Sequence, residues 1–119
     1  GRTFAATSVV ALPGEPEPPV RRPPHITITF SEERDEGVGW NVGCNSNGGR
    51  VRITGTRLLV RGSGGTLIGC EEEVLEEEEW LSELMIAEPE WSIKGDALTL
   101  IGKGAEVTLV SSAGLRGRV

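Results

Sequence analysis

The sequence predicts a mainly β fold, namely a small antiparallel β-barrel-like domain with one amphipathic helix, for which a lipocalin-like topology is one option. Short segments alternate between apolar and polar residues and are separated by turn residues. Glycine occurs 17 times and aromatic residues make up only 4% of the chain, a composition typical of strands joined by many turns. Only one stretch has a helical period. The 119 residues suit a single domain, 1–119, and small sheets protect their edges by closing or stacking.

The first third of the chain predicts two strands separated by a proline-rich loop. Residues 3–10 contain β-branched residues beside small ones, as strands do. Residues 12–24 hold nearly all the prolines, which lack a backbone donor, so we expect an extended loop of polyproline II character. In 25–30, Ile26, Ile28 and Phe30 fall on one face, which indicates a half-buried strand.

The middle of the chain predicts three more strands and several turns. We expect a polar turn over 34–37, a strand over 38–42 and short strands over 50–54 and 56–61, around Gly55. The cluster 45–49 is expected to turn, because Asn47-Gly48 is the strongest short hairpin signal in the chain. The glycine-rich segment 62–65 is expected to be a flexible loop.

Residues 71–86 predict the helix, since Val74, Leu81 and Met85 fall within a narrow arc with Leu84 beside them. Glutamates favour the positive end of a helix dipole, and four of them begin this segment: Glu71, Glu72, Glu73 and Glu76. Pro89 prevents much continuation. Strands are then expected over 91–94, 97–101 and 106–110, with a two-residue turn at Gly95-Asp96 and another turn at 102–104. We expect residues 115–119 to form either a last short strand or a frayed tail.

The charge of the chain argues against nucleic acid as a partner. The net charge is -6, and an acidic surface repels phosphate backbones. A local basic stretch is interpreted as the solvent face of a hairpin: Arg50, Arg52, Arg57 and Arg61. No segment has the roughly 20 apolar residues that span a bilayer. Because the chain starts at Gly1 without a signal-like stretch, we interpret it as a processed or excised fragment.

No residue pattern predicts catalysis. His25 is the one histidine, and no serine has the Gly-x-Ser-x-Gly surroundings of a nucleophile elbow. We therefore expect His25 to be exposed or at an edge, and keep a His25-dependent hydrolase as an alternative. Four acidic residues cluster in a turn without apolar cover and are expected to be surface residues: Glu32, Glu33, Asp35 and Glu36.

No cofactor or metal site is predicted. The glycine segments 62–65 and 102–104 do not match phosphate-binding loops. Consecutive glutamates on a helix splay apart and do not converge on calcium, and one histidine with two distant cysteines does not give a zinc spacing. Trp40, Trp80 and Trp91 are expected in the core, and a ligand cavity lined by them is the alternative.

Cys44 and Cys70 are the two cysteines, and both lie beside turns or element ends. A disulfide between them would close a loop of roughly 25 residues, worth about 3 kcal/mol in the chain-entropy model. Two reduced, buried thiols are the alternative. We favour the disulfide.

Together these motifs resemble the META domain family, also called HslJ-like after a bacterial heat-shock protein. The resemblance rests on Gly-Cys-Asn at 43–45, Thr-x-x-x-Cys at 66–70, the acidic helix and Gly-Asp-x-Leu-x-Leu at 95–100, in the family's order over nearly the whole chain. The signature positions are Gly43, Cys44, Asn45, Gly49, Thr66, Cys70, Gly95 and Asp96. We interpret Asn45 and Thr66 as hydrogen-bonding residues that fix the turns beside the cysteines.

The resemblance implies a β-barrel-like fold with one helix, and an extracytoplasmic setting in the bacterial envelope or outside the cell, often within a lipoprotein. It also implies a link to stress response and drug tolerance, and no established catalytic activity. The chain departs from the family in having Asn47 and Val51 where aromatic residues are common, and Leu67, Ile68 and Gly69 before the second cysteine. These departures concern a shared aromatic surface and leave the expected fold unchanged.

Our functional expectation is a non-catalytic, stress-associated envelope or secreted module of unknown molecular function. We expect a monomer that binds another protein or an envelope component, and any lipid anchor would lie outside this chain. The main alternative is a carrier of small hydrophobic ligands that uses the barrel interior. A protease inhibitor also stays open, because rigid loops on a small disulfide-closed domain suit that role.

Overall fold

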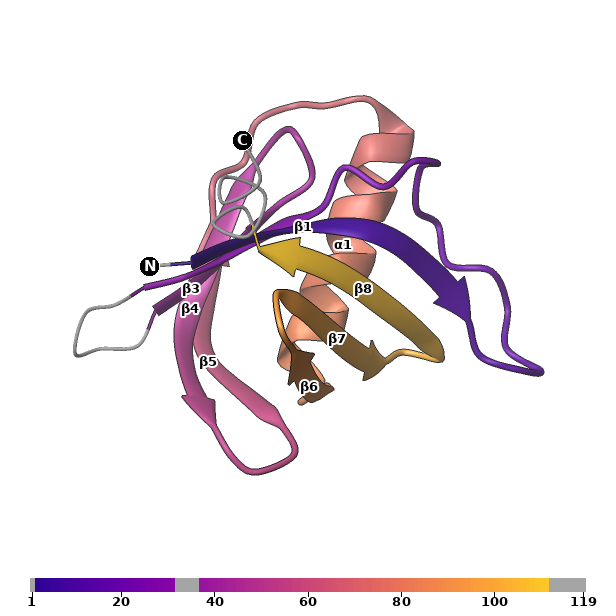
Figure 1. Cartoon of the computed structure of the whole chain (residues 1–119). Helices are drawn as coiled ribbons and strands as arrows, with labels where there is room; N and C mark the ends of the chain where they lie inside the picture. The colour runs from indigo at the N-terminus through magenta and orange to yellow at the C-terminus, as the bar shows by residue number, and fades with distance from the viewer. Residues whose placement is uncertain (1, 32–36, 112–119) are drawn as a thin grey trace, which may run out of the picture.

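The computed structural model describes residues 2–31 and 37–111, and it contains one antiparallel sheet and one helix there (Figure 1). These elements confirm the predicted mainly β fold with a single helix. In chain order they are β1 (Arg2–Ala11), β2 (Thr27–Phe30), β3 (Gly37–Asn41), β4 (Ser46–Ile53), β5 (Leu58–Gly65), α1 (Glu72–Ile86), β6 (Glu90–Lys94), β7 (Ala97–Gly102) and β8 (Ala105–Ser111).

The sheet has the neighbour order of an up-and-down barrel that is open at one seam. Its strand order is β5-β4-β3-β2-β1-β8-β7-β6, so each strand pairs with the next in sequence except at the β1–β8 junction and at the open seam between β5 and β6. The helix connection is inserted at this seam. The two edges touch at one place, where an isolated bridge joins Arg57 to Glu90 and the Leu58 N–H donates to the Pro89 carbonyl at 3.0 Å. The result is a curled half-barrel.

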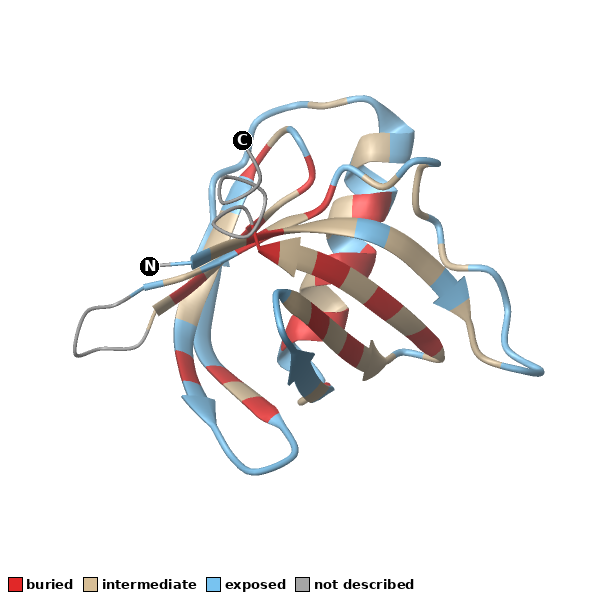
Figure 2. Cartoon of the chain, viewed as in Figure 1, coloured by how far each residue is buried: buried red, intermediate tan, exposed pale blue. Residues whose placement is uncertain are grey.

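The core lies between the concave inner face of the sheet and α1. Phe4, Ile28 and Trp40 are neighbours across three strands and are all buried, which marks the inner face. Alternate positions of β7 and β8 are buried in the same way (Figure 2). The helix presents four buried apolar side chains to this face: Trp80, Leu81, Leu84 and Met85. Trp40 and Trp80 are therefore core residues, as expected.

The two glycine-rich predictions for the middle of the chain were wrong. Residues 46–49 of the expected turn 45–49 lie within β4, and the expected loop 62–65 lies within β5; the two strands pair along Asn47–Gly65 and Gly48–Gly64. Two of these glycines are needed because the strands crowd them: a Cβ on Gly48 would lie 2.9 Å from the Val38 carbonyl oxygen, and one on Gly65 would lie 2.3 Å from Asn47 Oδ1. The chain turns earlier, at Gly43, where φ is +100°.

The remaining boundaries agree with the sequence to within a few residues. The helix follows Glu71 and ends before Pro89, and the β6–β7 hairpin turns at Gly95-Asp96 with a φ of +61° at Gly95. Most of the predicted turn 34–37, the acidic residues from Glu32 to Glu36 and the predicted last strand 115–119 lie outside the described residues. Within the described residues, α1 is the one helix, and it is too short and too polar to span a membrane.

Candidate functional site

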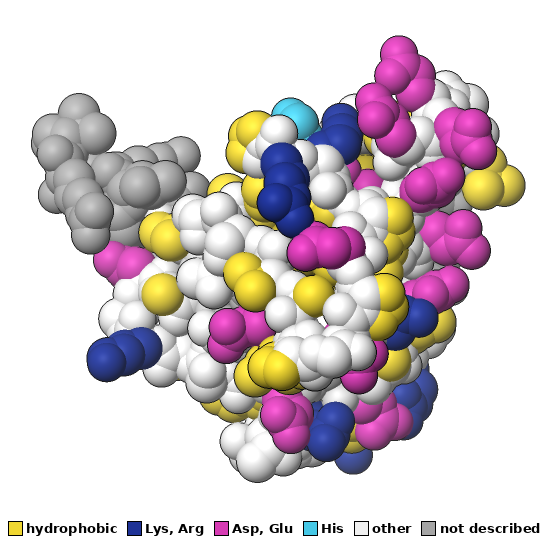
Figure 3. All heavy atoms as spheres, turned by 90° about the vertical axis from the view of Figure 1, so that its right-hand side faces the viewer, with side chains coloured by type: hydrophobic (Ala, Val, Ile, Leu, Met, Phe, Trp, Pro, Cys, Tyr) yellow, Lys and Arg dark blue, Asp and Glu magenta, His cyan; other side chains and the backbone are white. Residues whose placement is uncertain are grey.

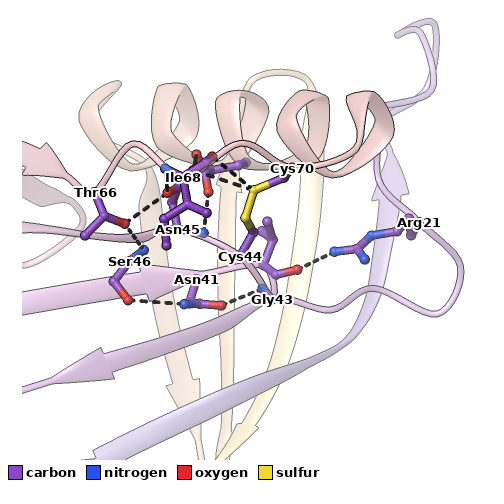
Figure 4. Close-up of a disulfide and its surroundings, with 11 residues drawn as sticks. Arg21, Asn41, Gly43, Cys44, Asn45, Ser46, Thr66, Ile68 and Cys70 are labelled. Carbon is purple, nitrogen blue, oxygen red and sulfur yellow. Dashed lines mark hydrogen bonds between the residues drawn. A yellow bond between two sulfur atoms is a disulfide. The ribbon is translucent and has the colours of Figure 1, made fainter.

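Asn45, the last residue of the Gly-Cys-Asn motif, is the centre of a hydrogen-bonded cluster that holds the Thr-x-x-x-Cys segment. Its side chain is buried, and Oδ1 accepts hydrogen bonds from Thr66 Oγ1 at 3.0 Å and from the Ile68 N–H at 2.6 Å. Nδ2 donates to the Ile68 carbonyl at 3.2 Å and to Glu78 Oε2 at 3.1 Å. One amide therefore satisfies both polar backbone groups of Ile68 (Figure 4). We call residues 66–70 the signature loop.

Thr66 ties the signature loop to β4. Its hydroxyl donates to Asn45 and accepts from the Ser46 N–H at 3.1 Å, while its own N–H donates to the Ser46 carbonyl at 3.0 Å. On the preceding turn, Asn41 Oδ1 accepts from the Gly43 N–H. The roles expected for Asn45 and Thr66, to fix the turns beside the cysteines, correspond to these bonds.

The predicted disulfide is present between Cys44 and Cys70, with 6.5 Å between the Cα atoms. It joins the same two segments that Asn45 joins (Figure 4). The signature loop is thus fixed to the β3–β4 turn both covalently and by hydrogen bonds.

Two neighbouring glutamates of α1 hold the β3–β4 turn and the end of the proline-rich loop. Glu78 accepts from the Asn45 backbone N–H at 3.1 Å as well as from its side chain. Glu77 has no exposed surface and accepts from Arg21 Nε at 2.6 Å, from the Arg21 N–H at 3.1 Å and from the His25 N–H at 3.3 Å. Arg21 also donates to the Val42 carbonyl. The end of the proline-rich loop is therefore attached to the helix.

The role of Glu77 was not predicted, because the run of glutamates was interpreted only as a favourable start of the helix. The signal was available: Glu77 lies three positions after Val74 and four before Leu81, on the apolar arc of the helix. A charged residue on that arc needs a buried partner. Glu71, Glu72, Glu73 and Glu76 are exposed, as expected.

The structure places the remaining sequence candidates apart from this cluster. His25 is exposed, and its hydrogen bond to Glu77 comes from the backbone N–H and not from the imidazole. All four arginines of the basic stretch are exposed; Arg57 pairs with Glu90 and Arg61 with Glu88. Among the remaining signature positions, Gly49 packs against the Arg61 carbonyl, and Asp96 lies in the β6–β7 turn 3.9 Å from Arg2.

The tip of the signature loop exposes apolar side chains. Leu67 is 99% exposed and Ile68 is 58% exposed, although the Ile68 backbone is held by Asn45. Large apolar side chains are usually buried, and a fixed, exposed pair is a feature of interaction sites. The residues that follow the signature loop in the sequence are acidic: Glu71, Glu72 and Glu73, at the start of α1.

The fold and this cluster define a small, disulfide-containing domain built as an open up-and-down barrel with one packed helix. A family model describes the same chain: residues 1–114 match the META domain, and the chain belongs to this family. A comparison with functionally curated proteins found no significant match.

Two solved structures are similar to this chain in fold. One is described as the NMR structure of a protein from Burkholderia xenovorans, and its sequence is 18% identical to this chain. The two structures superpose with a TM-score of 0.68, and the match covers 92% of this chain and 81% of the other chain. A second NMR structure is 19% identical, with a TM-score of 0.64 and coverage of 92% of this chain and 87% of its own.

We expect removal of the disulfide to lower the free energy of unfolding by about 3 kcal/mol, because the loop that it closes gains freedom in the unfolded chain. Urea unfolding of the oxidised protein and of the Cys44→Ser/Cys70→Ser double variant measures this loss. Intact mass without reductant checks the starting state, since the bond removes two hydrogen atoms. Equal unfolding midpoints for the two proteins would show that the bond does not constrain this loop.

Proposed function

We propose that the chain is a non-catalytic, stress-associated module of the bacterial envelope or of secreted proteins, and that it binds a partner protein through the signature loop. The observation that carries this proposal is the exposure of Leu67 at the tip of a loop that is otherwise fixed. Leu67 is 99% exposed, and both neighbours in the loop, Thr66 and Ile68, are hydrogen-bonded to the buried Asn45.

A fixed loop loses little conformational freedom on binding. The favourable free energy of the Leu67 contact is therefore not offset by an entropic cost of ordering the backbone. Ile68 adds a second partly exposed apolar side chain beside it. Exposed apolar anchors of this kind, when they enter a pocket of the partner, dominate the binding free energy of interfaces. The proposed partner therefore offers an apolar pocket to Leu67.

The charge beside the loop favours a basic protein over an anionic membrane. Three exposed glutamates, Glu71 to Glu73, follow the loop directly, and Glu76 lies one turn further along α1. Figure 3 shows acidic side chains gathered at the upper right, on the side where α1 begins. With a net charge of -6, the chain as a whole repels anionic lipid headgroups. Basic residues around the partner's pocket would complement this surface.

The disulfide supports the extracytoplasmic part of the proposal. Disulfides persist in oxidising compartments and are rare in the cytosol. Cys44 and Cys70 are bonded to each other, and the bond lies in the segment that positions Leu67. The proposed compartment therefore keeps the binding loop in its fixed form.

Photo-crosslinking from position 67 tests the proposal. We expect a benzophenone amino acid at Leu67 to give one discrete crosslinked product in envelope extract of the producing cells. The same group at Val10, which is 55% exposed on β1, is the matched control and should give no such product. With the crosslinked protein purified, Leu67→Ser should weaken binding by about 30-fold and Val10→Ser by less than twofold. Added salt should also weaken binding of the wild-type chain, because it screens the attraction between the glutamates and a basic partner.

Equal labelling from the two positions, or equal affinities of the Leu67→Ser and wild-type proteins, would contradict the proposal. Binding of the chain to vesicles of anionic lipid through position 67 would replace the protein partner by a membrane.

A further inference from the structure

The half-barrel also contains an apolar pocket that is separate from the signature loop. It lies at one end of the inner face, beside the open seam. Its volume is about 300 Å³, and residues from six strands line it. Pairing of Arg2 with Phe30, and of Phe4 with Ile28, places these residues in two adjacent rows of the inner face. Ile53 and Ile93 are 51% and 45% exposed and form its rim on the two edge hairpins.

The pocket takes up much of the aromatic content of the chain. Both phenylalanines, Phe4 and Phe30, and one of the three tryptophans, Trp91, line it. These walls are fixed in place: the two phenylalanine rings meet edge to face with centroids 5.9 Å apart, and Trp91 Nε1 donates to the Thr54 carbonyl at 2.9 Å. A concave, preformed apolar surface with few polar groups is typical of small-molecule sites.

Among the described residues that line the pocket, Arg2 is the one that carries a charge. Its guanidinium lies 4.9 Å from the centroid of the Phe4 ring. Its acidic neighbour, Asp96, is 3.9 Å away in an ion pair whose side chains are both about half exposed, and such pairs contribute little. A ligand carboxylate could therefore replace Asp96 and accept two hydrogen bonds from the guanidinium.

We infer that this pocket binds a small carboxylic acid with an apolar body, of the class of medium-chain fatty acids. At about 30 Å³ for each non-hydrogen atom, the pocket holds roughly ten of them. The apolar chain lies against Phe4, Phe30 and Trp91, and the carboxylate contacts Arg2 at the start of β1. This site is separate from the signature loop, so it goes beyond the proposed protein-binding function.

Calorimetric titration with decanoate, below its micelle-forming concentration, tests the inference. The wild-type protein should bind one decanoate with a Kd below about 0.1 mM. Decanol, which has the same chain without the charge, should bind about tenfold more weakly. Arg2→Gln should remove this preference by weakening decanoate about tenfold and leaving decanol within twofold. Arg52→Gln, at an exposed arginine of β4, is the control and should change neither affinity.

A second variant tests the volume of the pocket independently of charge. Ile93→Trp enlarges a rim side chain on β6 and should abolish binding of both ligands, with an unchanged far-UV spectrum showing that the fold persists. The inference is overturned if decanoate does not bind, if Arg2→Gln leaves decanoate affinity unchanged, or if only phospholipid vesicles and not decanoate bind. Because Leu67→Ser should bind decanoate as the wild type does, failure here is distinguishable from failure of the proposed function.

Discussion

Arg21→Ala is expected to lower the free energy of unfolding by about 3 kcal/mol or more. The substitution removes the side chain that neutralises Glu77, a carboxylate with no exposed surface, and breaking one partner of a buried ion pair leaves the other charge uncompensated. Backbone N–H groups of Arg21 and His25 would remain as donors, and they do not supply a full charge. Urea unfolding followed by tryptophan fluorescence measures the loss.

The next residue provides a matched control. Arg22 pairs with Glu17 at 2.6 Å, the same distance as the Arg21–Glu77 pair, but both members of this pair are largely exposed. Solvent screens such a pair, so Arg22→Ala should change stability by less than about 0.5 kcal/mol. Similar losses for the two variants would mean that the burial of Glu77 does not set the strength of its ion pair.

Asn45→Ala is the second substitution with a large expected effect, a loss of about 3 kcal/mol. The variant leaves the Ile68 N–H, the Ile68 carbonyl and the Thr66 hydroxyl without their Asn45 partner. A part-buried polar group left unsatisfied typically costs about 1–3 kcal/mol. Hydrogen exchange at the Ile68 amide should also become much faster, because that amide donates to Asn45 Oδ1.

Two companion variants separate the parts of this effect. Asn41→Ala removes a half-buried asparagine at the end of β3, whose side-chain hydrogen bonds to Gly43 and Ser46 are exposed to solvent, and should cost less than about 1 kcal/mol. Asn45→Asp keeps the acceptor oxygen but places a second carboxylate against Glu78, so it should be at least as unstable as Asn45→Ala at neutral pH. An Asn45→Asp protein as stable as the wild type would show that Nδ2 contributes nothing.

Local pattern was sufficient for the helix, the C-terminal meander and the strand that starts after His25. In each of these segments the period of the apolar residues agrees with the turn residues at its ends, so local and global preferences coincide. The disulfide also followed from two cysteines placed beside turns. The motif order placed Asn45 and Thr66 next to it without a structure.

The glycine-rich hairpin was not predictable in this way. Asn47-Gly48 has the sequence of a tight turn, yet Gly48 pairs with Gly39 and Gly64 inside the sheet. Its small size is required by the Val38 carbonyl, which belongs to a strand some ten residues earlier. A requirement set by a neighbouring strand is invisible to a rule that considers only adjacent residues.

The apolar pocket and the exposure of Leu67 could not be predicted from the sequence either. Phe4, Phe30 and Trp91 have no common motif, and pairing of distant strands brings them to one end of the inner face. Leu67 resembles any other strand residue in its local pattern, and it is exposed in a loop whose anchoring by Asn45 and by the disulfide the pattern does not show.

The pairing of β1 with β8 has a kinetic consequence. This junction joins residues roughly a hundred positions apart, from Phe4 with Ser111 to Ala11 with Ala105, and it links the two halves of the sheet. Closing so long a loop is entropically costly, so we expect it to form late. During synthesis, β1 emerges with one edge unpaired and keeps it until β8 has been made. A translocating or chaperone-bound chain would therefore present β1 as its most aggregation-prone edge.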